Sequence, residues 1–590
     1  MLLQVIASAG TAILTLFSAS CGGRKVQPAD LVLLNGSVYT MADAKPQAKA
    51  VVVAGNKIIA LYDQDIDAKR HVARNTRVID LGGRMALPGL IDSHVHFDQA
   101  GALINDANLL AVSDAAGLRK EIARVVAILE DGEWITRGLW GAYEQWRLGE
   151  AGESRSSGIL PWRPGRGMID DLTPKNPCFL CRYDGREWLA NSAALAAAGL
   201  PGVAPPQGLE IGPDGVPTGI IFFPSPAHDA VSRAMKPKSH RRLLDENRAA
   251  LRALRAAGIV EVHDIETPEQ TARFCELQDL GELTCRVWLR PDLERGAELR
   301  DAGFRMGVHP RTKAPDAMLR YGALKGYIDG IMGTHGALFF EPYADQPANF
   351  GHWRRHTSDD PELRVRNMEK MAGLVRTGLA AGFVPNVHAI GDRGVAEMLD
   401  LYERLRDEMG IDLKGFRIIH AQVIRPADFP RFKALGIIAE VNPYHISDDM
   451  RWMEERIGPE RCRGAYAFRS LIENGAVLCF GSDWPGTSAA YYHVHPRYLI
   501  YAAVARKTLT GAPPGGWFPE QRLTVEEALR AYTVNGARAA FDEASRGTLE
   551  PGKIADITVF DRDLFKASEA GLLEAEVDYT IVDGRVVFER

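Results

Sequence analysis

Eight short apolar segments, separated by longer stretches, run through the middle of the chain and constrain its fold more than any other feature. They cover residues 90–96, 259–263, 285–289, 324–328, 384–388, 417–420, 437–441 and 477–480. Amphipathic helical patterns lie between most of them, as at residues 364–381, 395–408 and 427–435. Eight successive strand–helix units predict an α/β fold in which parallel strands close into a (β/α)8 barrel of the TIM type.

The two ends of the chain carry a different pattern, in which short strands are punctuated by Gly and Asn. Such strands occur in residues 28–87 and again in residues 541–590, so we expect one small composite β-sandwich domain built from both termini. The barrel then comprises residues 88–100 with 241–540. Residues 101–240 are too many for one strand–helix connection, and we expect them to form an insertion that covers the mouth of the barrel.

The first residues of the chain resemble a secretion signal. Residues Leu2–Phe17 are almost all apolar or small, and Cys21 follows three small residues. We predict a leader over residues 1–21, as in an exported, periplasmic protein or a membrane-anchored lipoprotein acylated at Cys21. A cytoplasmic protein with a mis-started leader is the alternative. No other stretch of the sequence is long and apolar enough to span a bilayer.

Charge and cysteine content exclude two classes of protein. The chain of 590 residues has 70 Lys and Arg against 76 Asp and Glu, a formal net charge of −6, so it lacks the basic footprint of a nucleic-acid-binding protein. Its 7 Cys are too few for a disulfide scaffold. We expect a small-molecule substrate and no nucleic-acid partner, and an oligomer is compatible with the sequence.

Two histidines lie at the end of the first predicted barrel strand. Because His94 and His96 are two residues apart, they share one face of the strand, which in a barrel is the interior near its carboxyl-terminal mouth. Three more candidate ligands follow later strands: His388, His420 and Asp483. Each alone is compatible with a hydrogen-bonded core histidine or a turn aspartate. Together, at the ends of strands in one ring, they predict a metal site, and imidazole with carboxylate suits Zn²⁺.

Lys325 lies within the fourth predicted strand. A charged lysine is costly to bury, and burial lowers its pKa. The neutral amine that results is able to ligate a metal ion or to react with carbon dioxide. A solvated loop lysine is the alternative.

Several motifs resemble those of the amidohydrolase superfamily, specifically amidohydrolase family 3, the group similar to N-substituted formamide deformylases. They are Leu87–His96, Asn191–Leu195, Pro217–Gly219, His388–Arg393, Gly481–Pro485 and Gly547–Asp556. The resemblance covers about residues 30–590 and implies a metal-binding (β/α)8 barrel with a composite β-sandwich. It further implies one or two divalent ions on His94, His96, His388 and His420, with Asp483 as the metal-linked general base. In many relatives the lysine that corresponds to Lys325 is carboxylated and bridges two metal ions.

This resemblance implies a hydrolase that cleaves a non-peptide C–N bond. A divalent ion lowers the pKa of water from 15.7 to about 7 and polarises a carbonyl. Asp483 would then take a proton from the attacking water and pass it to the leaving nitrogen of an amide, an N-formyl or N-acyl amine, or a cyclic amide. Two alternatives stay open: a non-catalytic ligand-binding lipoprotein on the same barrel, and hydrolysis of an ester or phosphotriester at the same site.

The chain departs from the family pattern at four positions. Arg186 and His335 stand where a His and an Arg are usual, and Phe223 and Ile419 replace acids. We therefore expect an altered substrate pocket. The candidate substrate contacts are Arg186, His335, Trp140 and His445.

Overall fold

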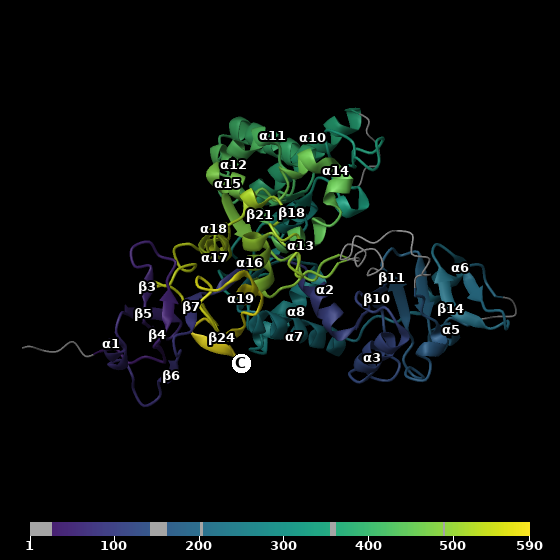
Figure 1. Cartoon of the computed structure of the whole chain (residues 1–590), viewed down its shortest axis with the longest axis horizontal. Coiled ribbons are helices and arrows are strands. Elements are labelled where there is room, and N and C mark those ends of the chain that lie inside the picture. The colour runs from purple at the N-terminus through teal and green to yellow at the C-terminus, as the bar shows by residue number, and fades with distance from the viewer. Residues whose placement is uncertain (1–25, 142–161, 201–204, 355–360, 488–489) are drawn as a thin grey trace, which may run out of the picture.

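The computed structural model describes residues 26–141, 162–200, 205–354, 361–487 and 490–590 (Figure 1). The predicted leader and its acylation at Cys21 lie outside these residues. A central α/β body lies between a β-rich body, which contains both ends of the described chain, and the body formed by the insertion (Figure 1). Among the described residues, none of the helices combines the length and apolar character needed to cross a membrane.

Two sheets of parallel strands form the centre. The first has the order β17 (Leu319–Tyr321), β16 (Arg286–Arg290), β15 (Ile259–Ile265) and β8 (Leu90–Val95). The second has the order β18 (Leu324–Tyr327), β19 (Pro385–Ala389), β20 (Arg417–His420), β21 (Ile438–Val441) and β22 (Val477–Phe480). Every segment that the sequence predicts as a central strand is therefore a strand of the structure, and the predicted α/β class is confirmed.

Two junctions connect these sheets. Only Gly322 and Ala323 separate β17 from β18, so the chain passes directly from the edge of one sheet to the edge of the other. At the opposite edges, Val95 at the end of β8 pairs in parallel with Trp484, which follows β22. Because the strands run in the same direction, residues that follow them gather at one end of the central body.

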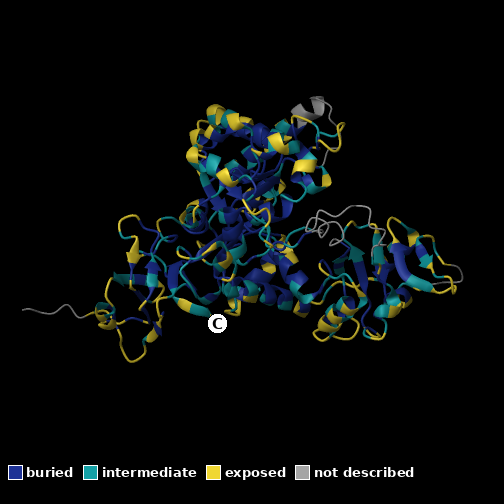
Figure 2. Cartoon of the chain, viewed as in Figure 1, coloured by how far each residue is buried: buried dark blue, intermediate teal, exposed yellow. Residues whose placement is uncertain are grey.

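The surrounding helices bury one face against the strands (Figure 2). In α11 (Asp392–Met409), Val395, Leu399 and Tyr402 recur at helical spacing and are fully buried. The helix stops at Gly410, whose φ of 64° is left-handed and favours glycine. Further helices of the central body include α7 (His240–Ala256), α8 (Pro268–Asp279), α10 (Pro361–Ala380), α12 (Phe429–Leu435), α15 (Phe468–Glu473) and α17 (Val525–Tyr532).

Strands from both ends of the chain pair in one sheet. β23 (Ile557–Phe560) lies antiparallel to β7 (Met85–Pro88), with Ile557 opposite Pro88. The rest of this sheet consists of β24 (Val577–Val582), β25 (Arg585–Glu589), β2 (Ser37–Tyr39) and β3 (Gln47–Ala48). A second sheet has the order β5 (Lys57–Tyr62), β4 (Ala50–Ala54), β1 (Leu31–Leu34) and β6 (Arg77–Asp80). Buried Leu33, Val51 and Ile557 belong to one apolar cluster, which links the two sheets.

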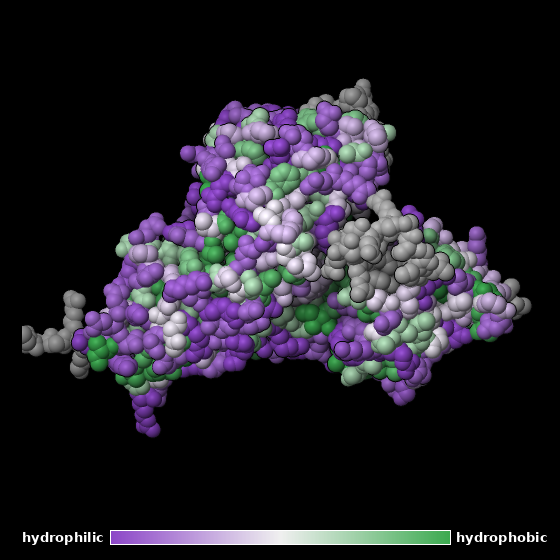
Figure 3. All heavy atoms as spheres, viewed as in Figure 1, coloured by the Kyte–Doolittle hydropathy of each residue, from purple (hydrophilic) through white to green (hydrophobic). Residues whose placement is uncertain are grey.

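The insertion has its own six-stranded sheet. Its order is β13 (Leu209–Ile211), β14 (Pro217–Phe222), β12 (Glu187–Ala190), β11 (Phe179–Arg182), β10 (Arg137–Trp140) and β9 (Ala107–Asn108). Helix α3 (Ala115–Val126) packs Leu118, Ile122 and Val125 into the same apolar cluster as Leu180 and Leu189 of the sheet. The face of the molecule in Figure 3 is mostly hydrophilic, with hydrophobic residues gathered in small groups.

Candidate metal centre

A cavity of about 710 Å³ opens where the parallel strands of the central body end. The predicted ligands all belong to its wall: His94, His96, Lys325, His388, His420 and Asp483. Four of them come from β8, β18, β19 and β20, and His96 and Asp483 come from the segments that follow β8 and β22. Residues nearly 400 positions apart in the sequence therefore meet at one point.

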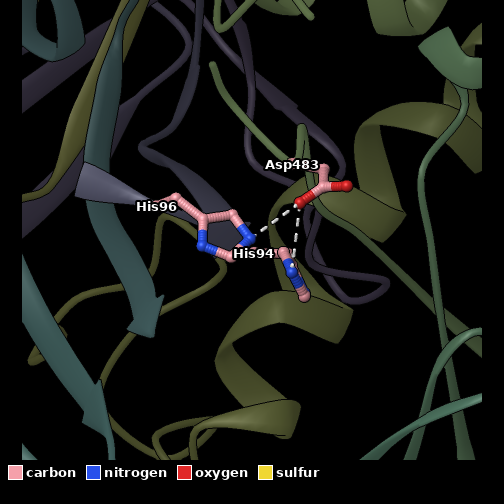
Figure 4. Close-up of side chains that lie close together, drawn as sticks. All are labelled: His94, His96 and Asp483. Carbon is pink, nitrogen blue, oxygen red and sulfur yellow. Dashed lines mark ion pairs between the residues drawn. The ribbon is translucent and has the colours of Figure 1, made fainter. Parts of the chain in front are cut away.

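His94, His96 and Asp483 form the tightest group (Figure 4). The Asp483 Oδ1 atom lies 3.3 Å from His94 Nε2 and 3.2 Å from His96 Nε2. The backbone creates this contact, because the Asp483 N–H donates to the His94 carbonyl at 2.8 Å. Gly481 permits it: a Cβ atom at that position would lie 2.4 Å from His94 Cβ, so only glycine lets the end of β22 approach β8 this closely.

A second group shares the same carboxylate. His445 Nε2 lies 3.5 Å from Asp483 Oδ2, and candidate ligand atoms of His420, His445 and Asp483 are all within 4.8 Å of one another. The His388 ring is 4.5 Å from the His420 ring. Buried His388 Nε2 has no hydrogen-bond partner among the described residues, although Asp329 Oδ1 is 3.4 Å away. A buried imidazole nitrogen without a hydrogen-bond partner, in a cavity wall that also carries His420, His445 and Asp483, fits the role of a metal ligand.

The protonation states reinforce this interpretation. Burial holds the pKa of His94, His388 and His420 below the ordinary histidine value, so these imidazoles are neutral at neutral pH. A neutral imidazole carries one N–H, and the Nδ1 atoms of His94 and His420 lie 2.7 and 2.8 Å from Glu440 and Asn442 oxygens, which accept that proton. The Nε2 atoms of His94 and His420 then each carry a lone pair that is able to bind a metal ion. Several lone pairs that converge on one carboxylate form a donor set that a divalent cation would satisfy.

Lys325 lines the cavity and is only 1% exposed. Burial and the charge of Arg290 hold its pKa well below the ordinary value, so the amine is neutral. Its Nζ atom lies 4.8 Å from the centre of the Tyr327 ring, and that ring is 5.6 Å from the His388 ring. A positive charge on Lys325 would lower the pKa of both His94 and His388, so the amine lies within electrostatic reach of both histidines.

The sequence prediction missed Glu440, which orients His94. Glu440 lies on β21 and is fully buried, and its Oε1 atom accepts from His94 Nδ1. Arg290 donates to both carboxylate oxygens at 3.0 Å, and Arg417 donates to Oε2 at 2.9 Å. The only hint of this role in the sequence was that Glu440 is a charged residue inside an apolar strand segment. Its partners were not visible, because they lie on β16 and β20.

Two further buried carboxylates fix the loops that carry ligands. Asp92 Oδ1 accepts from the backbone N–H groups of His94 at 3.1 Å and Ser482 at 2.9 Å. Asp329 accepts from the N–H of Gly391 at 2.8 Å, just beyond His388. These bonds hold the ends of β8, β19 and β22 in place before any ligand is bound.

The four candidate substrate contacts separate into two pairs. Arg186 and His445 line the cavity, whereas Trp140 and His335 lie outside its wall. Trp140 is 2% exposed in the apolar core of the insertion, because alternate residues of β10 face inward. His335 has a left-handed φ of 57°, and its ring bonds to Asp345 at 2.9 Å and to Arg456 at 2.7 Å.

Further residues of the cavity wall, on loops, helices and the end of β18, were not connected to the site by the sequence. They are Gln99, Tyr183, Asp184, Tyr327, Arg354, Gln422, Asp448, Asp449, Trp452 and Tyr492. The wall therefore combines aromatic rings, carboxylates and guanidinium groups around the cluster of histidines, as expected of a small-molecule site.

Comparison with known proteins gives one family. A profile of the Amidohydrolase family matches residues 77–588. Protein LONG AFTER FAR-RED 3 of Arabidopsis thaliana is 31% identical over 581 residues, which cover 95% of this chain and 92% of the relative. N-substituted formamide deformylase of Arthrobacter pascens is 26% identical, with coverage of 96% and 99%. Putative amidohydrolase YtcJ of Bacillus subtilis is 27% identical, with coverage of 94% and 98%.

Solved structures share the fold. An uncharacterized metal-dependent hydrolase from Pyrococcus horikoshii superimposes with a TM-score of 0.68 at 23% identity, over 92% of this chain and 99% of that one. Its counterpart from Pyrococcus furiosus gives 0.67 at 24% identity, over 91% and 100%.

Proposed function

The chain belongs to the Amidohydrolase family, which confirms the predicted relationship, and from this premise we propose that it hydrolyses a non-peptide C–N bond. The family is metal-dependent, and the described residues contain groups able to hold a metal ion. The substrate in this proposal is an amide, an N-formyl or N-acyl amine, or a cyclic amide. One observation carries it: Asp483 meets His94, His96 and His445 inside a cavity that admits a small molecule.

His94, His96, His420 and Asp483 would hold the metal ion, with His388 and Lys325 beside them for a second ion. The donor set of neutral imidazole and carboxylate suits Zn²⁺. A bound divalent cation supplies a Lewis acid, which acidifies water and polarises a carbonyl oxygen. A carboxylated Lys325 is part of the proposal, since its neutral Nζ atom would add to carbon dioxide and release one proton.

In this proposal Asp483 carries the proton. Its Oδ1 atom faces His94 and His96, and its Oδ2 atom faces His445, so histidines lie next to both carboxylate oxygens. A proton taken by this carboxylate from water would be passed to the leaving nitrogen. That transfer matters because an amide anion is a very poor leaving group, whereas a neutral amine leaves readily.

The domain organisation is part of the same proposal. The parallel strands would close into one (β/α)8 barrel, with β17 and β18 as its fourth strand. Residues 28–87 with 541–590 would form the composite β-sandwich. Residues 101–240 would cover the mouth, which agrees with Arg186 on the cavity wall.

The test is turnover by the metal-loaded protein on a panel of N-formyl amines, N-acyl amines, cyclic amides, esters and phosphotriesters. The proposal predicts release of amine from at least one amide. Asp483→Asn, in which an amide of nearly the same shape replaces the carboxylate, is the matched control and should release amine about 10²–10⁴-fold more slowly. Turnover confined to esters or phosphotriesters would contradict the C–N assignment, and stoichiometric metal without any turnover would favour a ligand-binding protein.

A further inference from the structure

Helix α13 (Tyr444–Asp449) forms one wall of the cavity beside the candidate metal centre. His445 and Asp449 are four residues apart and so lie on one face of this helix. Both line the cavity, and His445 contacts Asp483. Asp449 therefore lies about one helical turn, roughly 6 Å along the helix axis, from a residue of the candidate centre.

The Asp449 carboxylate is held firmly through one of its oxygens. Tyr466 Oη donates to Oδ2 at 2.5 Å, and Gln422 Nε2 donates to the same atom at 2.9 Å. In the part of the chain that the structure describes, no donor reaches Oδ1 and no Lys or Arg forms an ion pair with Asp449. The neighbouring Asp448 differs, because its carboxylate is paired with Arg451.

Charge is distributed unevenly along the cavity. The rings of Tyr327, His388, His420, His445 and Tyr492 form a row with successive centre distances of 5.6, 4.5, 6.0 and 4.0 Å. Arg354 lies 3.8 Å above the Tyr327 ring at one end of this row. Asp449 lies near the other end, since burial and the charge of Asp449 raise the pKa of Tyr492. Trp452, whose backbone N–H donates to the Asp449 carbonyl at 3.0 Å, also lines the cavity. The histidines of the candidate centre lie between the two ends.

We propose that Asp449 binds a positively charged, N–H-bearing group of the substrate, an ammonium, amidinium or guanidinium, next to an aromatic or apolar portion. This inference rests on the proposed function and names the substrate class more closely. Asp449 lines the cavity and its Oδ1 atom accepts from no donor among the described residues, so a cationic N–H group in the cavity would supply that donor. Burial also raises the pKa of Asp449 to about 7, as expected of a carboxyl group that lacks a cationic partner in the protein.

Binding of a probe tests the subsite without relying on hydrolysis. Benzamidinium is a planar cation whose two N–H groups match a carboxylate, and acetophenone is a neutral molecule of similar shape. Isothermal titration of the zinc-loaded protein, at a pH above the pKa of Asp449, should show benzamidinium bound at least about tenfold more tightly than acetophenone. Equal affinities in the wild type would overturn the proposal before any variant is made.

Asp449→Asn should remove this preference, since the amide keeps the shape and loses the charge. Asp448→Asn is the matched control, because its carboxylate is on the same wall but already paired, and it should keep the preference. Thermal unfolding establishes that both variants fold. If both variants retain the preference, or both lose it, Asp449 is not the specific partner.

The two proposals fail in different ways. Hydrolysis of neutral amides with no preference for benzamidinium would refute the Asp449 subsite and leave the amidohydrolase assignment intact. Benzamidinium binding that depends on Asp449, in a protein that hydrolyses no amide, would refute the assignment and leave the subsite intact.

Discussion

Replacing Glu440 by Gln tests whether the buried network beneath the candidate centre prepares His94 for a metal ion. Glu440 accepts from His94 Nδ1 at 2.7 Å and is held by Arg290 and Arg417, all fully buried. Loss of a carboxylate that orients a ligating histidine lowers metal affinity by about 10–100-fold. That corresponds to about 1.4–2.8 kcal/mol of binding free energy. The substitution also leaves two buried guanidinium groups undercompensated, so the free energy of unfolding should fall by about 3 kcal/mol or more.

Two measurements separate these effects: metal affinity by competition with a chromophoric chelator, and unfolding in urea. Glu261→Gln is the matched control. Glu261 is an equally buried strand glutamate, but its partners are Arg320, Arg546 and His263 rather than His94. We expect both variants to lose stability and only Glu440→Gln to lose metal affinity. If the two variants bind metal equally well, the reasoning about His94 is wrong.

Two further predictions rest on the geometry of the site and one on the sequence of the leader. Asp483→Asn should retain much of the bound metal and lose turnover by about 10²–10⁴-fold, measured as amine release; normal hydrolysis would contradict the proton-carrier role. Gly481→Ala should destabilise the fold and weaken metal binding, since its Cβ atom would lie 2.4 Å from His94 Cβ. Unchanged thermal unfolding and metal content would show that this contact relaxes easily. Cys21→Ser should abolish labelling by a radioactive fatty acid in cells, and an unlabelled wild type would refute the proposed anchor.

The central strands were predictable because each is a buried apolar run bounded by polar residues. Since parallel strands all end at one edge, the position of a residue after its strand was enough to predict that His94, His388 and Asp483 meet. The sequence could not show that β17 and β18 belong to different sheets. That split depends on the path of the chain at Gly322, where a side chain would collide with Trp288.

The rest of the cavity was not predictable, for a physical reason. Asp449, Tyr492 and Arg354 lie outside the strands, and their positions depend on how loops and short helices pack rather than on local periodicity. Local geometry also decides which side chains lie outside the cavity wall, as at His335 and Trp140. Both have residue types suited to a substrate pocket, but a left-handed turn and the alternation of β10 direct them elsewhere.

Anomalous diffraction from crystals of the zinc-loaded protein tests the central claim most directly. The account predicts a strong zinc peak within coordination distance of His94 Nε2, His96 Nε2 and Asp483 Oδ1, the three atoms that already converge. A protein that binds zinc only elsewhere, or that binds none while these side chains keep their present positions, would contradict it.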